Sequence, residues 1–112
     1  MRKAAHAGSW YTDNPKELDN ELSGYMAAAK KFEIPEGSKI KGLIGPHAGF
    51  YFSGPTAGWG YINLDKNAYK RVFLLGPSHK AYLSGCALTK ARFYETPFGN
   101  LEIDHEINAQ LN

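Results

Sequence analysis

Two short apolar runs, each stopped by Gly-Pro and followed closely by a histidine, constrain this chain more than any other feature. The first is Leu43-Ile44-Gly45-Pro46-His47 and the second is Leu74-Leu75-Gly76-Pro77-Ser78-His79. Glycine and proline do not readily continue a sheet ladder, so each run is predicted to end a β-strand. The connection between them is long enough for a right-handed crossover between parallel strands. Both histidines would then face the rim at which open α/β sheets bind ligands.

From this arrangement we predict that His47 and His79 are two ligands of one metal site. Neutral imidazole is the commonest metal-binding side chain, and strand ends would hold it in place. Two ligands do not complete a site, because zinc takes three or four protein ligands and non-haem iron(II) is typically held by two histidines and a carboxylate. The alternative interpretation is that both are hydrogen-bonded loop histidines next to strand ends.

The composition argues against two broad classes of partner. The 112 residues carry 13 Lys+Arg and 11 Asp+Glu, a net charge of +2, which is too balanced to indicate a nucleic-acid or membrane surface. No apolar stretch is long enough for a secretory signal or a membrane span. The single cysteine, Cys86, cannot form an intramolecular disulfide and favours a reducing compartment. We therefore expect one soluble, cytoplasmic domain.

Capping signals predict a helix near the amino end. Asn14-Pro15-Lys16-Glu17 combines a capping asparagine, a proline at the first helical position and a glutamate three residues after the cap. Apolar residues spaced on one face extend this helix to about Lys31. Gly24 lies inside it and is interpreted as a point of close packing.

Two further helices are expected. Ser53-Gly54-Pro55 begins a short one that runs to about Ile62, with Ser53 or Gly54 as its cap. Asp104 caps the last one, whose apolar face is left with little chain to cover it. We therefore interpret the sequence as the amino-terminal part of a larger domain.

The strands expected between these helices make the chain an α/β protein. The turn that joins two of them is Pro97-Phe98-Gly99-Asn100. The expected strands span residues 39–44, 71–75, 86–89, 92–96 and 101–103.

Other polar residues have structural alternatives to a functional role. His6 is a third candidate for the rim, with a packed histidine as the alternative. His105 follows a helix cap and is interpreted as solvated. Cys86 reads as a small buried residue rather than a nucleophile. Ser78 precedes His79, but neighbours in an extended chain point apart, which argues against a catalytic Ser-His pair.

A group of aromatic residues also has two interpretations. They wall a ligand pocket, or they fill the core. They are Trp10, Tyr11, Phe50, Tyr51 and Phe52.

Several of these motifs, taken in order, resemble the amino-terminal part of the Memo family. They are His6-Ala7-Gly8-Ser9-Trp10-Tyr11, Gly45-Pro46-His47-Ala48-Gly49, Gly76-Pro77-Ser78-His79 and Cys86-Ala87-Leu88. The resemblance implies that residues 1–112 are part of a single layered αβα-type domain around a mixed, partly parallel sheet. This fold is similar to that of the class III extradiol non-haem iron dioxygenases.

The resemblance also implies a site. In the family, the histidines that correspond to His47 and His79 bind iron or copper, and the third ligand is a cysteine beyond residue 112. Trp10 corresponds to a pocket residue near the metal, and we expect His6, Phe52 and Ser78 in the same ligand pocket. Any enzymatic activity would be that of a metal-dependent oxidoreductase resembling the extradiol dioxygenases.

The family also implies partners. Animal members are associated with redox activity, with cell motility downstream of receptor tyrosine kinases and with phosphotyrosine-bearing peptides or receptors. The same cleft would serve a non-enzymatic peptide-binding module, and an inactive fragment is the third alternative. Phe50 and Phe52 stand where animal members carry tyrosines, so contacts through those hydroxyls do not transfer.

Overall fold

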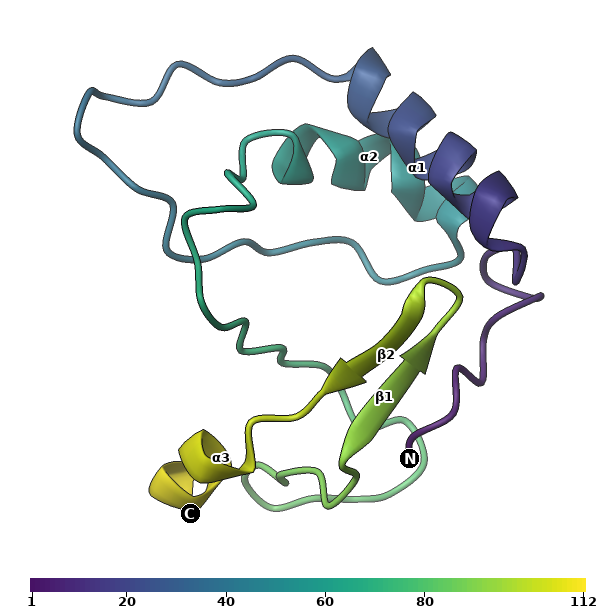
Figure 1. Ribbon diagram of the computed structural model, residues 1–112, viewed down its shortest axis with the longest axis vertical. Helices are drawn as coiled ribbons and strands as arrows, with labels where there is room; N and C mark the ends of the chain where they lie inside the picture. Colours follow the sequence, from purple (N-terminus) through teal and green to yellow (C-terminus); the bar gives the residue numbers. More distant parts are fainter. The chain divides into compact units, whose positions relative to one another are not determined.

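The computed structural model describes residues 1–112, which form three helices and one two-stranded sheet (Figure 1). The chain divides into two compact units. The helical unit, Ala5–Ala68, contains α1 (Pro15–Ala28) and α2 (Phe50–Tyr61). The hairpin unit joins Met1–Ala4 to Tyr69–Asn112 and contains β1 (Phe93–Thr96), β2 (Gly99–Glu102) and α3 (His105–Leu111). The mixed α/β class is confirmed.

The predicted cap of α1 is confirmed. The Asn14 side-chain oxygen accepts hydrogen bonds from the backbone N–H groups of Lys16 at 3.0 Å and Glu17 at 3.1 Å. The Glu17 carboxylate does not complete a capping box, because it accepts the Thr12 hydroxyl at 2.9 Å while that same hydroxyl accepts the Asn14 N–H at 3.2 Å. Thr12 therefore accepts the Asn14 N–H in place of the Glu17 carboxylate.

The far end of α1 differs from the prediction. The helix ends at Ala28 rather than near Lys31, and Ala29 is already extended. Beyond it, the Phe32 N–H donates to the Asn63 side chain at 2.7 Å. The Phe32 N–H therefore bonds a distant residue instead of continuing the helix. The spacing of apolar residues along the helix does not show where such a bond ends it.

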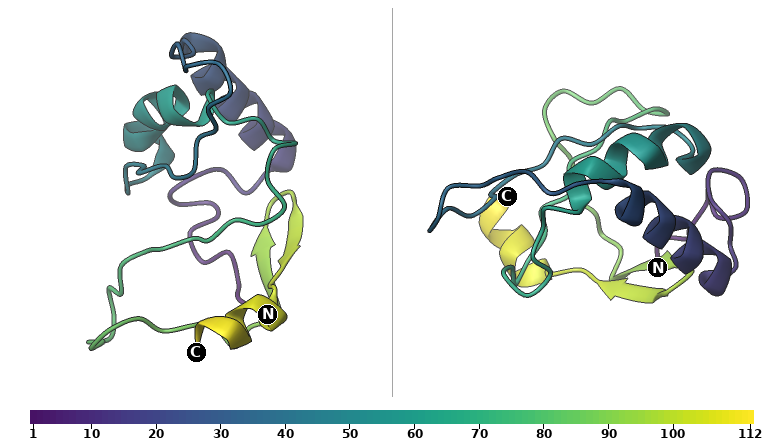
Figure 2. Two further views of the ribbon diagram at one scale, coloured as in Figure 1. Left: turned by 90° about the vertical axis from the view of Figure 1, so that its left-hand side faces the viewer. Right: turned by 90° about the horizontal axis from the view of Figure 1, so that it is seen from above.

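Helices α1 and α2 pack side by side through glycines (Figures 1 and 2). Gly54 lies against the ring of Tyr25, and a Cβ at Gly58 would lie 2.6 Å from the Tyr25 carbonyl oxygen. The Glu21 carboxylate accepts the Tyr25 hydroxyl at 2.7 Å and raises the pKa of Tyr25 to about 12. Close packing was predicted at Gly24, but nothing lies within 4 Å of a Cβ there, so that interpretation is wrong.

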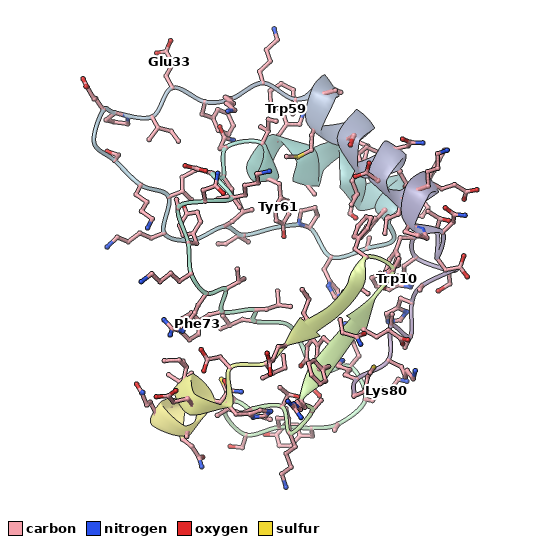
Figure 3. The ribbon with its side chains drawn as sticks, viewed as in Figure 1. Trp10, Glu33, Trp59, Tyr61, Phe73 and Lys80 are labelled. Carbon is pink, nitrogen blue, oxygen red and sulfur yellow. The ribbon has the colours of Figure 1, made fainter.

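The two strands predicted to end at the Gly-Pro motifs are absent. Residues 39–44 and 71–75 form no strand, and the only sheet is the antiparallel β1–β2 hairpin rather than a partly parallel one. Both segments leave apolar side chains in solvent: Ile44 is 101% exposed and Leu75 84%. Phe73, labelled in Figure 3, is 60% exposed. A strand is part of a ladder of hydrogen bonds with a neighbouring strand, and neither segment belongs to a sheet.

The predicted hairpin is present, but its turn is shorter than predicted, because Gly99 and Asn100 belong to β2 rather than to the turn. Phe93 pairs with Glu102 and Thr96 with Gly99, so Pro97-Phe98 forms the turn, and Gly99 has a φ of +117°, which favours glycine. The expected strand at 86–89 is absent. Instead, the amino terminus joins the sheet: the Arg2 N–H donates to the Phe93 carbonyl at 2.8 Å, and the Glu95 N–H donates to the Arg2 carbonyl at 2.9 Å.

The predicted Asp104 cap of α3 is also confirmed. One carboxylate oxygen accepts the Ile107 N–H at 3.0 Å, and the other accepts Arg71 Nε at 2.8 Å. The Arg71 guanidinium and the Ile107 N–H lower the pKa of Asp104. None of the three helices combines the length and apolar character needed to cross a membrane.

The glycine contacts predict opposite effects for two alanine substitutions. Gly58→Ala places a methyl group against the Tyr25 backbone, and overpacking of this kind lowers the free energy of unfolding by about 1–3 kcal/mol. Gly24→Ala enters open space and should raise it by up to about 1 kcal/mol, because alanine favours the helix. Urea unfolding followed by far-UV circular dichroism measures both. Equal effects of the two substitutions would contradict the close approach of Gly58 to the Tyr25 backbone.

The amino-terminal attachment should depend on pH. The Ala4 N–H donates to Glu95 Oε2 at 3.2 Å and the Lys3 ammonium lies 3.3 Å from Oε1, and these two contacts lower the pKa of Glu95. Because this pKa is lower in the folded chain than in the unfolded chain, the stabilisation is present above the ordinary glutamate pKa. It is lost as the pH falls through the folded value.

The Ala4 amide resonance followed by NMR during acid titration should therefore shift with a midpoint below the ordinary glutamate pKa. Glu95→Gln is the matched control, since its amide cannot ionise. The contact is disproved if the Ala4 resonance titrates identically in that variant.

Candidate functional site

Three ring side chains of the predicted site come together in the helical unit. The imidazole of His6 stacks on the indole of Trp10, with ring centroids 4.6 Å apart and an interplanar angle of 28°. The indole meets the imidazole of His47 edge to face, at 5.5 Å and 65°. His6 and His47 are exposed, and Trp10, labelled in Figure 3, is half-buried. We call this row of rings the His6–Trp10–His47 stack.

A tight loop brings His6 and Trp10 together. The His6 carbonyl accepts hydrogen bonds from the Ser9 N–H at 3.1 Å and the Trp10 N–H at 2.9 Å. Gly8 has a φ of +84°, a conformation that side-chain-bearing residues rarely adopt, and its N–H donates to the Tyr11 carbonyl at 2.7 Å. The motif His6-Ala7-Gly8-Ser9-Trp10-Tyr11 therefore specifies a closed turn that presents both rings.

The same loop fixes the chain that carries His47. The Trp10 carbonyl accepts the Phe50 N–H at 2.7 Å, at the start of α2. The ring of Tyr11 stacks on that of Phe50, with centroids 5.0 Å apart. A Cβ at Gly49 would lie 3.4 Å from the Trp10 carbonyl oxygen, so a larger residue would crowd this approach. His47 thus lies three residues before Phe50, whose N–H is hydrogen-bonded to the amino-terminal loop.

The other predicted site residues belong to α2 and to the hairpin unit. Phe52 is 76% exposed on α2 and contacts Tyr51 edge to face at 5.1 Å. His79 and Ser78 belong to the hairpin unit, where the Ser78 hydroxyl donates to the Ala81 carbonyl at 2.6 Å. The union of His47 and His79 in one site stays a prediction. Cys86, interpreted above as buried, is exposed, so that interpretation is wrong.

Comparison with known proteins identifies the family. The model of the family described as Memo-like protein matches residues 2–112. The chain belongs to the Memo-like family. It is 43% identical to the protein memo-1 homolog of Caenorhabditis elegans, over 98% of this chain and 30% of that protein. It is 41% identical to protein MEMO1 of Danio rerio and 38% identical to that of Homo sapiens, in each case over 98% of this chain and 36% of the relative.

This chain spans about a third of the length of these Memo-like relatives. Within residues 1–112, no three histidine, cysteine or acidic side chains are grouped so as to hold a metal ion. Imidazole nitrogens of the kind that His47 and His79 carry suit iron and copper, but two of them are fewer donors than a stable site requires. The donor type of these two residues therefore suits a transition metal, and their union in one site stays a prediction.

One polar cluster of this Memo-like chain was not predicted from the sequence. In the hairpin unit, Arg2 donates to the Tyr94 hydroxyl at 3.2 Å and places its guanidinium 5.0 Å from the centroid of the same ring. A hydrogen bond with Thr89, and to a smaller extent one with Arg2, lowers the pKa of Tyr94. The partners are far apart along the chain, and only the unpredicted pairing of the amino terminus with β1 joins them.

Proposed function

We propose that this chain supplies two histidine ligands, His47 and His79, to an iron or copper site in a Memo-like protein. The observation that carries the proposal is the His6–Trp10–His47 stack, which holds an exposed imidazole on a loop tied to α2 by the Trp10–Phe50 hydrogen bond. An imidazole held in one place loses less conformational entropy when it binds a metal. Membership of the family supports the same assignment for both residues.

The proposal includes a fold in which residues 39–44 and 71–75 become neighbouring parallel strands. Their exposed apolar side chains, with Ile44 at 101% and Leu74 at 81%, support this, because runs of large apolar side chains normally pack against protein. The strands would belong to a layered αβα domain similar to class III extradiol dioxygenases. The remainder of that domain, with the third ligand, would correspond to the part of the relatives that this chain does not cover.

The chain's own residues would bind and orient the metal, whereas the bound ion would supply one-electron or Lewis-acid chemistry. Any catalysis would be that of a metal-dependent oxidoreductase. We extend the proposal, through the family resemblance alone, to a cytoplasmic role in cell motility signalling.

Copper titration of the 112-residue chain tests the two ligands. Loss of a residue that merely supports a ligand lowers metal affinity by about 10–100-fold, so His47→Ala and His79→Ala should each weaken Cu²⁺ binding by at least that much. His105→Ala is the matched control, because His105 is exposed and its Nε2 lies 3.1 Å from the Ala91 carbonyl. Isothermal titration calorimetry gives the affinities. Unchanged affinity in the His47→Ala, His79→Ala double variant would sink the proposal.

A second candidate function is binding of a phosphotyrosine-bearing peptide at the same loop. The exposed rings of Tyr51 and Phe52, at 82% and 76%, favour it because they offer aromatic surface close along the chain to His47. An imidazolium would form a charge-assisted hydrogen bond with the phosphate.

Titration with a phosphotyrosine peptide and its unphosphorylated twin tests this function. The phosphorylated peptide should bind more tightly, and Phe52→Ala should weaken both peptides, because the aromatic contact does not need the phosphate. Leu101→Ala, which removes an exposed side chain of the hairpin unit, is the control. Equal affinity for the two peptides would rule the function out.

A further inference from the structure

We infer that His6 is a positioning residue that holds the Trp10 indole against His47 and thereby fixes the orientation of the His47 imidazole. The inference rests on the proposed function for its consequence, which is tighter metal binding. Its structural part, the dependence of His47 on His6 through Trp10, can be measured without metal.

The order of the three rings supports this role. Trp10 contacts His6 through a stacked arrangement at 4.6 Å and His47 through an edge arrangement at 5.5 Å. Stacked and edge-to-face geometries are the two that aromatic rings prefer, because the negative face of one ring meets the positive edge of another. His6 therefore restricts the plane of the indole, and the indole restricts the plane of the His47 ring.

The backbone contacts make the role of the His6 side chain separable from the folding of the loop. The loop is closed by the His6 carbonyl, which accepts from the Ser9 and Trp10 N–H groups, and any residue at position 6 retains that carbonyl. The Trp10 carbonyl is tied to the Phe50 N–H. Replacing the His6 side chain therefore leaves the backbone of Trp10 in place and frees only the side-chain torsions of the indole.

The size of the effect follows from the strength of such a ring pair. An aromatic pair shifts an equilibrium by about 2- to 10-fold beyond its buried area. His6→Ala should lower Cu²⁺ affinity by this factor, which is less than the loss of a ligand. His6→Phe keeps a ring that stacks but has no nitrogen, so it should retain the native affinity.

NMR of the His47 imidazole protons is the direct test, because the ring current of Trp10 shifts them only when the two rings are held together. Without metal, His6→Ala should move these resonances toward the values of an unstructured histidine, and His6→Phe should keep them near their native positions. His105→Ala is the control and should leave them unchanged. Far-UV circular dichroism of each variant verifies that α1 and α2 are formed.

Copper titration of the same variants in a Trp59→Phe background completes the experiment, since Trp10 is then the only tryptophan and its quenching reports the bound ion. Unchanged His47 resonances in His6→Ala would overturn the inference. An equal loss of copper affinity in His6→Phe and His6→Ala would also overturn it, because His6 would then act as a ligand. Shifted His47 resonances with no copper binding by the parent chain would support the positioning role and count against the proposed metal site.

Discussion

The helical unit depends on one hydrogen bond, from the Phe50 N–H to the Trp10 carbonyl, at 2.7 Å. The first N–H groups of any helix lack partners inside it, and the capping residue Gly49 has no side chain that could accept from them. Trp10 satisfies the first of these groups, and the Gly49 carbonyl accepts from Phe52 at 2.9 Å and from Ser53 at 3.0 Å. A contact between distant segments therefore takes the place of a side-chain cap and determines where α2 begins.

This constraint explains why the sequence misplaces α2. Ser53 or Gly54 was predicted as the cap because Pro55 is favoured at a first helical position. In the structure the helix begins at Phe50, and Pro55 lies inside it. The Ser53 hydroxyl is turned back onto the carbonyls of Ala48 at 2.9 Å and Gly49 at 3.2 Å. The local signal was real, but the bond to Trp10 extends the helix ahead of it.

Other elements divide in the same way between local and distant causes. Asn14 and Asp104 act on neighbouring residues, and both caps were predicted correctly. The turn predicted at Pro97-Phe98-Gly99-Asn100 was placed near the right position, although Gly99 and Asn100 pair in β2. The strands at 39–44 and 71–75 were predicted from composition, but a strand also needs a partner, and composition does not provide one. The pairing of Arg2 with β1 was not predicted, because an isolated bridge between one residue of each segment leaves no alternating pattern in the sequence. The candidate site follows this division: the closeness of His6 and Trp10 is local, and only the fold shows the contact of Trp10 with His47.

The positions of the two proposed ligands, His47 and His79, therefore depend on different interactions. His47 lies in a loop fixed by a backbone hydrogen bond, a glycine that permits close approach and a row of rings, all within residues 6–50. His79 follows an apolar segment in which Val72 is 86% exposed and Leu75 84% exposed. The position of His79 in a completed site would thus depend on the pairing of that segment with another strand. In the proposed site, metal affinity would rise when the sheet forms, because strand pairing fixes the second imidazole before the metal arrives. Metal binding and completion of the fold would then stabilise each other, since a ligand that binds only the ordered state shifts the equilibrium toward it.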